Sequence, residues 1–153
     1  MPSPIMEEPI RRILGLTKKM FEDTIAGTHK IETGTGTKAI HAALERVNVD
    51  SAIKVAQEAF REGPASKRDE AVKLLGYLQT LKKANIKPSA LMLRKVLVIP
   101  PNFRPITAMN KLKMEADANA LYVDLMNANS AYQDLRTDLG EEHTGDERLQ
   151  LYK

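Results

Sequence analysis

The 153-residue chain contains no cysteine and no tryptophan, and aromatic residues make up only 5% of it. Without cysteine it can form neither a disulfide nor a thiolate-ligated zinc site. No apolar run approaches the 18 residues that would indicate a membrane-spanning helix, and residues 1–4 do not resemble a signal peptide. We therefore expect a cytoplasmic protein with no membrane partner, whose core is built from aliphatic side chains and methionine.

The chain also lacks a recognisable catalytic constellation. Its acidic pairs are adjacent in sequence, at residues 7–8, 22–23 and 141–142, which predicts solvated surface rather than a Mg²⁺ site. The glycine- and threonine-rich segment 27–36 has no phosphate-loop spacing. The three histidines lie on different segments with no four-residue pairing. We therefore predict no catalytic residue, no metal site and no activity for this chain alone.

Hydrophobic residues make up 42% and charged residues 28%, which is typical of one globular domain or of a piece of a larger one. The formal net charge of +3 hides an asymmetry. Residues 1–114 carry a net charge of +9, whereas residues 115–153 carry −6. This division indicates two surfaces with different partners, the basic one suited to phosphates, although solvated helix faces would also account for it.

Apolar spacing predicts a mainly α fold built of helical hairpins. Gly15 ends the first helix, Thr17 caps the second, and either Asp50 or Asn48 caps the fourth. Gly63 and Pro64 then separate two helices that should pack as an antiparallel pair. The expected helices span residues 7–14, 17–25, 37–47, 51–61, 66–84 and 118–139, and a short one begins at Asp146.

Residues 96–105 read VLVIPPNFRP, in which three prolines follow or interrupt an apolar β-branched run. Proline fixes its own φ and favours extended geometry in the residue before it, so we expect a stiff extended segment. A short β-like stretch is predicted over residues 94–109, strand-like at 94–99. The resulting division is 1–92, 93–116 and 117–153, where the second part is the proline-rich segment with a polar loop.

The last part predicts a coiled-coil arm that Asp117 caps and Gly140 ends. The following helix stops after two turns at Lys153, so this truncated hairpin cannot bury its own seam. We interpret this as a sign that the chain is incomplete or has a partner. The predicted seam consists of Leu121, Tyr122, Leu125, Met126, Asn129, Tyr132 and Leu135.

The proline-rich segment resembles the V-x-P-P-x-x-R-P signature of the largest, β′-type, subunit of multisubunit RNA polymerases. Four further stretches are similar to motifs of that family in the same order. Residues 36–44 resemble G-x-x-A-I-x-x-L-L, 66–81 a S-x-T-K-R-x-K-L helix, 87–98 K-P-E-W-M-I-L-x-V-L-P-V, and 116–129 S-D-L-N-x-L-Y-x-x-V-I-x-x-N. The chain looks more like divergent phage-encoded forms than like a cellular enzyme, and it lacks the family's N-A-D-F-D-G-D metal loop.

The resemblance implies that the chain forms the clamp region, with residues 106–116 as the lid that separates transcript from template. Lys111 and Lys113 would then meet phosphates, and Leu112 or Met114 would wedge against a base pair. An ordinary polar loop is the alternative. Arg104, held between prolines, is suited to a phosphate or a carboxylate, and its alternative is an ion pair within the clamp.

The hairpin from Asp117 corresponds to the clamp coiled coil, on which initiation factors of the σ type dock. We therefore predict a partner-binding surface of Leu121, Tyr122, Leu125, Asn127, Asn129 and Tyr132, although Tyr122 and Asn129 can instead pack in the seam. Because the hairpin is acidic where the family is rich in arginine, we expect a more basic factor. The implied partners are the remaining polymerase subunits or fragments, the DNA template and the RNA–DNA hybrid, with Mg²⁺ held elsewhere in the full polymerase.

Two other functions remain open. A free-standing interaction protein could mimic the clamp coiled coil and sequester an initiation factor through residues 117–153. A basic helical module could instead bind nucleic acid through the lysine-bearing face of residues 67–83.

Overall fold

The computed structural model describes residues 1–109 and 112–153, with side chains for 1–107 and 115–153. The structure is mainly helical, as predicted, with one small two-stranded sheet in its described part. It divides into two compact units, Met1–Leu93 and Arg94–Lys153. The functional division at residues 92 and 116 stays a prediction.

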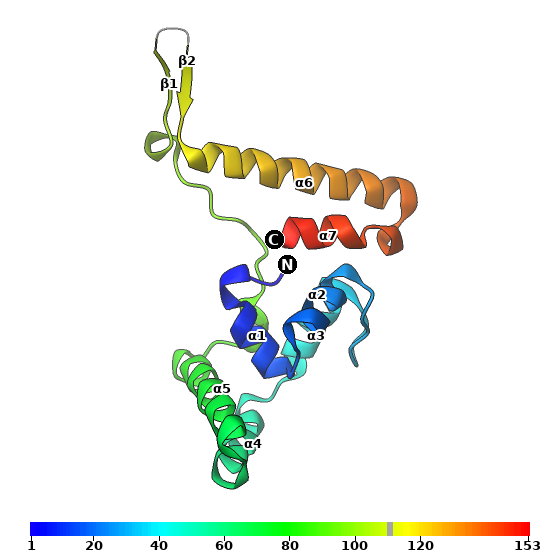
Figure 1. Ribbon diagram of the computed structural model, residues 1–153, viewed down its shortest axis with the longest axis vertical. Helices are drawn as coiled ribbons and strands as arrows, with labels where there is room; N and C mark the ends of the chain where they lie inside the picture. The colour runs from blue at the N-terminus through cyan, green and yellow to red at the C-terminus, as the bar shows by residue number, and fades with distance from the viewer. Residues whose placement is uncertain (110–111) are drawn as a thin grey trace. The chain divides into compact units, whose positions relative to one another are not determined.

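The first unit contains the predicted helices, with ends within two residues of expectation (Figure 1). Local sequence explains these ends. Gly15 adopts φ = 66° at the end of the first helix, a conformation that glycine reaches without a Cβ clash. The helices are α1 (Glu7–Leu14), α2 (Lys18–Ala26), α3 (Gly36–Arg46), α4 (Val49–Glu62) and α5 (Ala65–Ala84), with 3₁₀ turns η1 (Pro4–Met6) and η2 (Pro88–Leu91).

Side-chain caps begin α2 and α4. The Thr17 hydroxyl accepts a hydrogen bond from the Met20 amide at 3.2 Å, as the sequence predicts. The Asn48 side chain accepts one from the Ser51 amide at 3.1 Å. Asn48 is therefore the cap of α4, and Asp50 lies in the first turn, where its charge complements the helix dipole.

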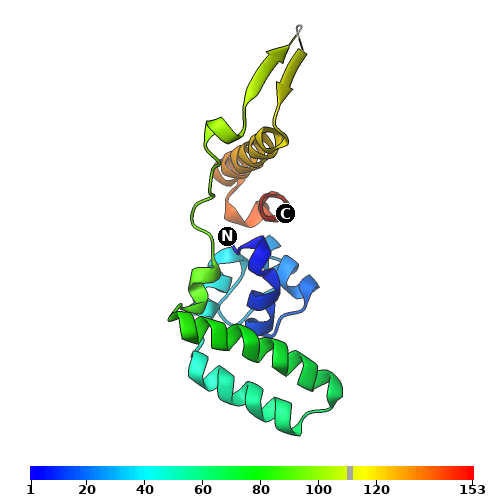
Figure 2. The same ribbon diagram turned by 90° about the vertical axis from the view of Figure 1, so that its left-hand side faces the viewer.

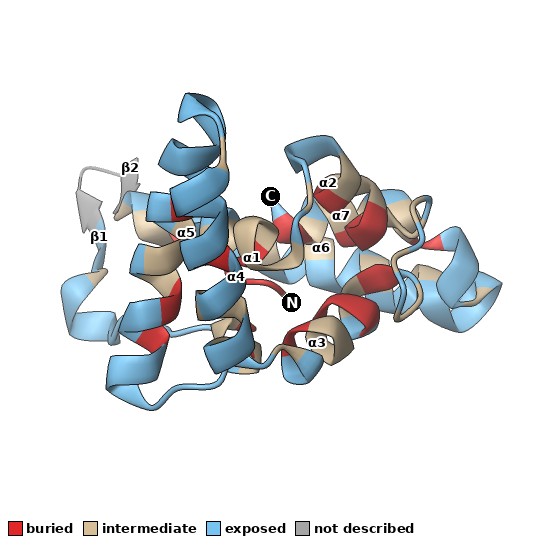
Figure 3. Cartoon of the chain, turned by 90° about the horizontal axis from the view of Figure 1, so that it is seen from below, coloured by how far each residue is buried: buried red, intermediate tan, exposed pale blue. Residues whose placement is uncertain are grey.

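The antiparallel α4–α5 hairpin confirms the predicted helix pair (Figure 2). Gly63 stands at its turn, where a Cβ would come within 2.4 Å of the Ala59 carbonyl oxygen. The core of the first unit lies where α1, α2, α3 and α5 contribute buried residues (Figure 3). The fully buried apolar side chains are Pro2, Ile10, Phe21, Ile25, Ile40, Leu44 and Leu78.

The second unit differs from expectation in its extended segments. The predicted strand-like residues 94–99 form no strand; the Ile99 amide and the Leu97 carbonyl bond instead to the Tyr122 hydroxyl. The predicted lid loop instead contains two antiparallel strands, paired from Ile106↔Glu115 to Met109↔Leu112. Residues with β-forming side chains directly after Pro105 favour this arrangement. The elements are η3 (Pro101–Phe103), β1 (Ile106–Met109) and β2 (Leu112–Glu115).

The helical part of the second unit is a hairpin of α6 (Asp117–Leu139) and α7 (Gly145–Tyr152), joined through η4 (Glu141–His143) (Figure 1). Gly140 ends α6 at φ = 87°, as predicted. The predicted Asp117 cap is wrong: Ala116 holds the extended cap conformation, and Asp117 is the first helical residue. Asp117 still complements the dipole from there.

The second unit buries little apolar surface. Among its described residues, Tyr152 is the one aromatic or aliphatic side chain in the buried class. By contrast, Leu97 is 91% and Phe103 79% exposed, and Leu121 on α6 is 69% exposed. Contiguous exposure of large apolar side chains marks surfaces that partners cover. In the described part of the chain, no helix is both long and apolar enough to cross a membrane.

Candidate functional site

The proline-rich ribbon and the start of α6 are joined through Arg104 and Asn119. The Arg104 Nη1 donates to Asn119 Oδ1 at 2.9 Å, and Asn119 Nδ2 donates back to the Arg104 carbonyl oxygen at 3.2 Å. Arg104 Nε also donates to the Ile99 carbonyl oxygen at 2.8 Å. Asn119 is buried, so both ends of its amide need partners, and this arrangement supplies one for each.

Tyr122, one turn further along α6, holds the other end of the ribbon. Its hydroxyl accepts from the Ile99 amide at 2.9 Å and donates to the Leu97 carbonyl oxygen at 3.2 Å. The guanidinium carbon of Arg104 lies 5.2 Å from the centre of the Tyr122 ring, within the range of a cation–π contact. We call Arg104, Asn119 and Tyr122 the ribbon–helix junction.

The junction fixes the base of the β1–β2 hairpin at both ends. The ribbon enters β1 immediately after Pro105, and β2 leads through Ala116 into α6. The Ala116 amide donates to the Pro105 carbonyl oxygen at 3.4 Å, so the entering and leaving chains also meet directly. This arrangement orients the hairpin relative to α6.

The structure gives Arg104 internal partners that are neutral. Its contacts are two carbonyl or amide oxygens and an aromatic face, with no carboxylate ion pair among the described residues. With the described residues of this chain, Arg104 therefore does not form the ion pair that was its alternative role. A phosphate contact by Arg104 stays a prediction, alongside the positioning role that its geometry supports.

The predicted nucleic-acid contacts fall mostly outside what the structure describes. Lys111 lies outside the described residues, as do the side chains of Leu112, Lys113 and Met114. The backbones of Lys113 and Met114 belong to β2, opposite Ala108 and Thr107. Their predicted contacts with phosphates and bases remain predictions.

The predicted seam of α6 is only partly correct. Tyr122, Leu125, Tyr132 and Leu135 are half-buried, whereas Leu121, Met126 and Asn129 are exposed. None of the seven is fully buried, as expected of a hairpin whose second helix has only eight residues. The predicted partner-binding set therefore contains exposed residues (Leu121, Asn127, Asn129) and half-buried ones (Tyr122, Leu125, Tyr132).

The α6–α7 hairpin also has a shallow acidic groove of about 450 Å³. Asp124 and Glu147 supply its carboxylates, and Asn127 and Gln150 supply amides. Cationic side chains suit such a lining. Elsewhere, the residues that the structure describes include no group of three or more side chains able to hold a metal ion.

Sequence reasoning missed Asn119 as a functional residue. It stands in the same short motif as Tyr122, but the sequence offers no distance information across the 15 residues that separate it from Arg104. A polar residue at an inward-facing position of an amphipathic helix was the available signal, because a buried amide requires partners.

No family model matches the chain, but sequence relatives do. They belong to one class, the subunits of multisubunit RNA polymerases. The DNA-directed RNA polymerase subunit β′ of Streptococcus agalactiae is 30% identical over 128 residues, which cover 82% of this chain. That of Bacillus licheniformis is 29% identical over 113 residues and 73% of this chain. Subunit γ of Rippkaea orientalis is 28% identical over 113 residues, also 73% of this chain.

The chain spans only about a tenth of the length of the β′ relatives that it matches, and 18% of the γ subunit. Over most of its length it is homologous to a region of the RNA polymerase β′ subunit. The resemblance seen in the sequence is thereby confirmed at this level.

Proposed function

We propose that this chain is a noncatalytic part of the β′-type subunit of a DNA-directed RNA polymerase, contributing clamp, lid and initiation-factor docking helix to transcription. Homology to β′ over most of the chain supports the polymerase role. The observation that carries the finer assignment is the ribbon–helix junction, which ties both ends of the β1–β2 hairpin to the start of α6.

In this proposal the β1–β2 hairpin is the lid. A lid must hold its shape where transcript and template separate, and a hairpin fixed at its base meets this need better than a loop. Lys111 and Lys113 contact phosphates of the RNA–DNA hybrid, while Leu112 or Met114 stacks against its last base pair. Arg104 positions the hairpin and lies near the phosphate backbone of the hybrid.

The α6 helix is the docking surface for an initiation factor of the σ type. Its exposed Leu121, Asn127 and Asn129 offer one apolar contact and two amides. The acidic groove beside them favours a factor with basic side chains. The exposed apolar ribbon around Leu97 and Phe103 is covered by other parts of the polymerase.

The remaining parts of the polymerase supply what this chain lacks. They hold the catalytic aspartates and Mg²⁺, and they bind the DNA template. The enzyme works in the cytoplasm, that of the host cell if the gene belongs to a phage.

The lid role can be tested by replacing Lys111 and Lys113 together with alanine, in polymerase purified through a tag on this chain. We expect transcripts that remain annealed to the template over a longer hybrid, measured by their sensitivity to RNase H. A matched double replacement of Lys30 and Lys54, both exposed in the first unit, should leave the hybrid length unchanged. A normal hybrid in the Lys111 and Lys113 variant would refute the lid assignment.

A further inference from the structure

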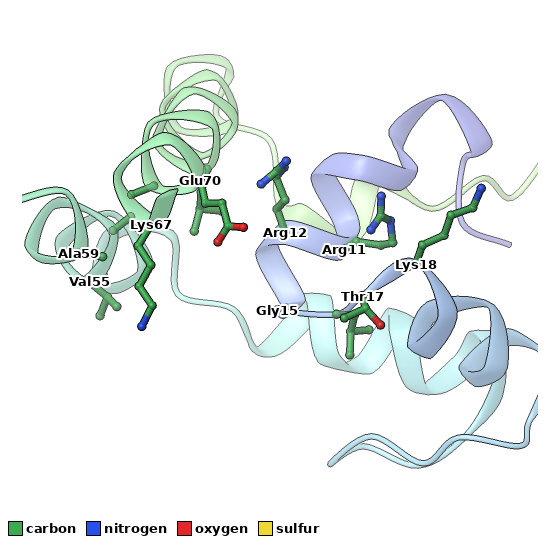
Figure 4. A pocket seen from close by; sticks show the side chains of 13 residues that line it. Arg11, Arg12, Gly15, Thr17, Lys18, Val55, Ala59, Lys67 and Glu70 are labelled. Carbon is green, nitrogen blue, oxygen red and sulfur yellow. The ribbon is translucent and has the colours of Figure 1, made fainter. Parts of the chain in front are cut away.

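The first unit has a pocket that the proposed polymerase role does not use. Its volume is about 610 Å³, within the range of ligand sites, and it lies where the end of α1 and the start of α2 face the α4–α5 hairpin (Figure 4). Four of its lining side chains are cationic: Arg11, Arg12, Lys18 and Lys67.

The two arginines form ion pairs within the chain, whereas the two lysines form none with the residues that the structure describes. Arg11 lies 3.1 Å from Glu7, and Arg12 lies 2.8 Å from Glu8, each one turn back along α1. Lys18 and Lys67 are exposed and form no ion pair among the described residues. The pocket therefore has at its rim two ammonium groups with no carboxylate partner in the described part of the chain, Lys67 from α5 and Lys18 from α2 (Figure 4).

The pocket wall between the charges is aliphatic. Leu16 and Leu74 lie on two sides of it, and Val55 and Ala59 project from α4. Val55 is 65% exposed, which leaves a large β-branched side chain in water. A single apolar side chain entering from outside would remove this surface from water, which favours its binding.

Glu70 adds a hydrogen-bond acceptor to the pocket. It lines the same pocket, extends from α5 toward α1 in Figure 4, and has no hydrogen bond or ion pair among the described residues. A carboxylate accepts hydrogen bonds, so a ligand that brings a donor as well as negative charge can pair with Glu70, which is otherwise exposed to water.

We propose that this pocket binds an acidic peptide segment with one large apolar side chain. Its carboxylates pair with Lys18 and Lys67, the apolar side chain packs against Leu16 and Val55, and a backbone amide donates to Glu70. Double-stranded DNA fits less well. A DNA phosphodiester backbone brings no donor to Glu70, and the pocket lining has no aromatic side chain on which a base could stack.

The test is a selection of random twelve-residue peptides on the full chain, followed by affinity measurement with the fluorescein-labelled winner. We expect winners with at least two carboxylates around one Leu, Ile, Phe or Trp. Reversing both lysines (K18E with K67E) should weaken binding at least about tenfold, because like charges would then face each other. Reversing Lys30 and Lys83 instead changes the net charge equally and should cause less than about a threefold loss.

A second variant tests the apolar contact independently of charge. Val55→Asp should abolish binding, whereas Val72→Asp, at another exposed valine, should retain it. Far-UV circular dichroism checks that each variant is folded. Winners without acidic residues, or equal losses in the pocket and control pairs, would overturn the proposal. The proposal would also be overturned if the chain bound a 20-base-pair DNA duplex and only this binding, not that of the peptide, depended on Lys18 and Lys67. None of these results depends on whether the chain joins a polymerase.

Discussion

Arg104 and Asn119 exchange hydrogen bonds in both directions: the guanidinium donates to the side-chain oxygen at 2.9 Å, and the side-chain amide donates to the backbone carbonyl at 3.2 Å. Two donors and two acceptors are thereby satisfied across 15 residues of chain, in a unit with few buried apolar side chains. Polar contacts thus determine the local geometry of this unit more than apolar packing does.

Replacing Asn119 with alanine should destabilise the second unit by about 1.5–3 kcal/mol, since it removes the partners of the Arg104 Nη1 group and of the Arg104 carbonyl oxygen. Urea unfolding followed by circular dichroism measures the change. Asn127→Ala, an exposed position on the same helix, is the matched control and should stay within about 0.5 kcal/mol of the unmodified chain. Equal stabilities of the two variants would show that the pair does not hold the ribbon.

Tyr122→Phe removes only the hydroxyl that bridges Ile99 and Leu97, while the ring beneath Arg104 remains. We expect a loss of about 1 kcal/mol and faster amide exchange over residues 96–104. Hydrogen–deuterium exchange with mass spectrometry measures this directly. Tyr132→Phe serves as the control, because no hydrogen bond of its hydroxyl is seen among the described residues. Unchanged exchange in the Tyr122 variant would count against the junction.

Phe21 is fully buried in the first unit, whereas Phe60 on α4 is nearly half exposed. Phe21→Ala should therefore cost about 3–5 kcal/mol, through lost transfer energy and the cavity left behind. Phe60→Ala should cost about 1 kcal/mol or less. Thermal unfolding of both variants measures the two losses of stability. Similar losses would contradict the placement of Phe21 in the core and of Phe60 at the surface.

Two glycines of the α4–α5 hairpin should respond in opposite directions to alanine. A Cβ on Gly63 would overlap the Ala59 carbonyl oxygen, so Gly63→Ala should destabilise by about 1–3 kcal/mol. A Cβ on Gly76, in the middle of α5, meets open space and should stabilise the helix by about 0.5–1 kcal/mol. Melting temperatures that shift in the same direction would contradict the turn geometry.

Asp50 and Lys82 form a contact at 2.6 Å between α4 and α5. The hydrogen bond from Lys82, aided by its charge, holds the pKa of Asp50 below its usual value. The stabilisation is therefore present above the usual carboxyl pKa and is lost as the pH falls through the lowered one. In Lys82→Ala the pKa of Asp50, measured by carboxyl ¹³C NMR, should rise toward its usual value, whereas Lys83→Ala should leave it unchanged. Because both partners are largely exposed, little stability is involved.

The helices of the first unit were predictable because local signals and periodicity agree there. Gly15, Thr17 and Gly63 end or begin helices as their chemistry requires, and the apolar spacing predicted the helices that carry the core. The choice between Asn48 and Asp50 as a cap could not be made from sequence, since both residue types accept hydrogen bonds from amides.

The second unit was harder to predict because its geometry depends on contacts between distant residues. The exposure of Leu121 was predictable, because a second helix of eight residues cannot cover all of α6. Residues 94–99 have strand-like composition, yet their peptide groups bond to Tyr122 and Arg104 rather than to a strand. β-forming side chains favour a strand only where a neighbouring strand is available for pairing.

Whether this chain works inside a polymerase can be tested by purifying the tagged chain from its native cell and identifying the bound proteins by mass spectrometry. We predict recovery of a large polypeptide that carries the aspartate metal-binding motif. A tagged chain with Asn119→Ala shows whether the association depends on the ribbon–helix junction. Recovery of a small initiation factor without any polymerase core would instead support a clamp mimic, and a chain that purifies with no polymerase component would contradict the account.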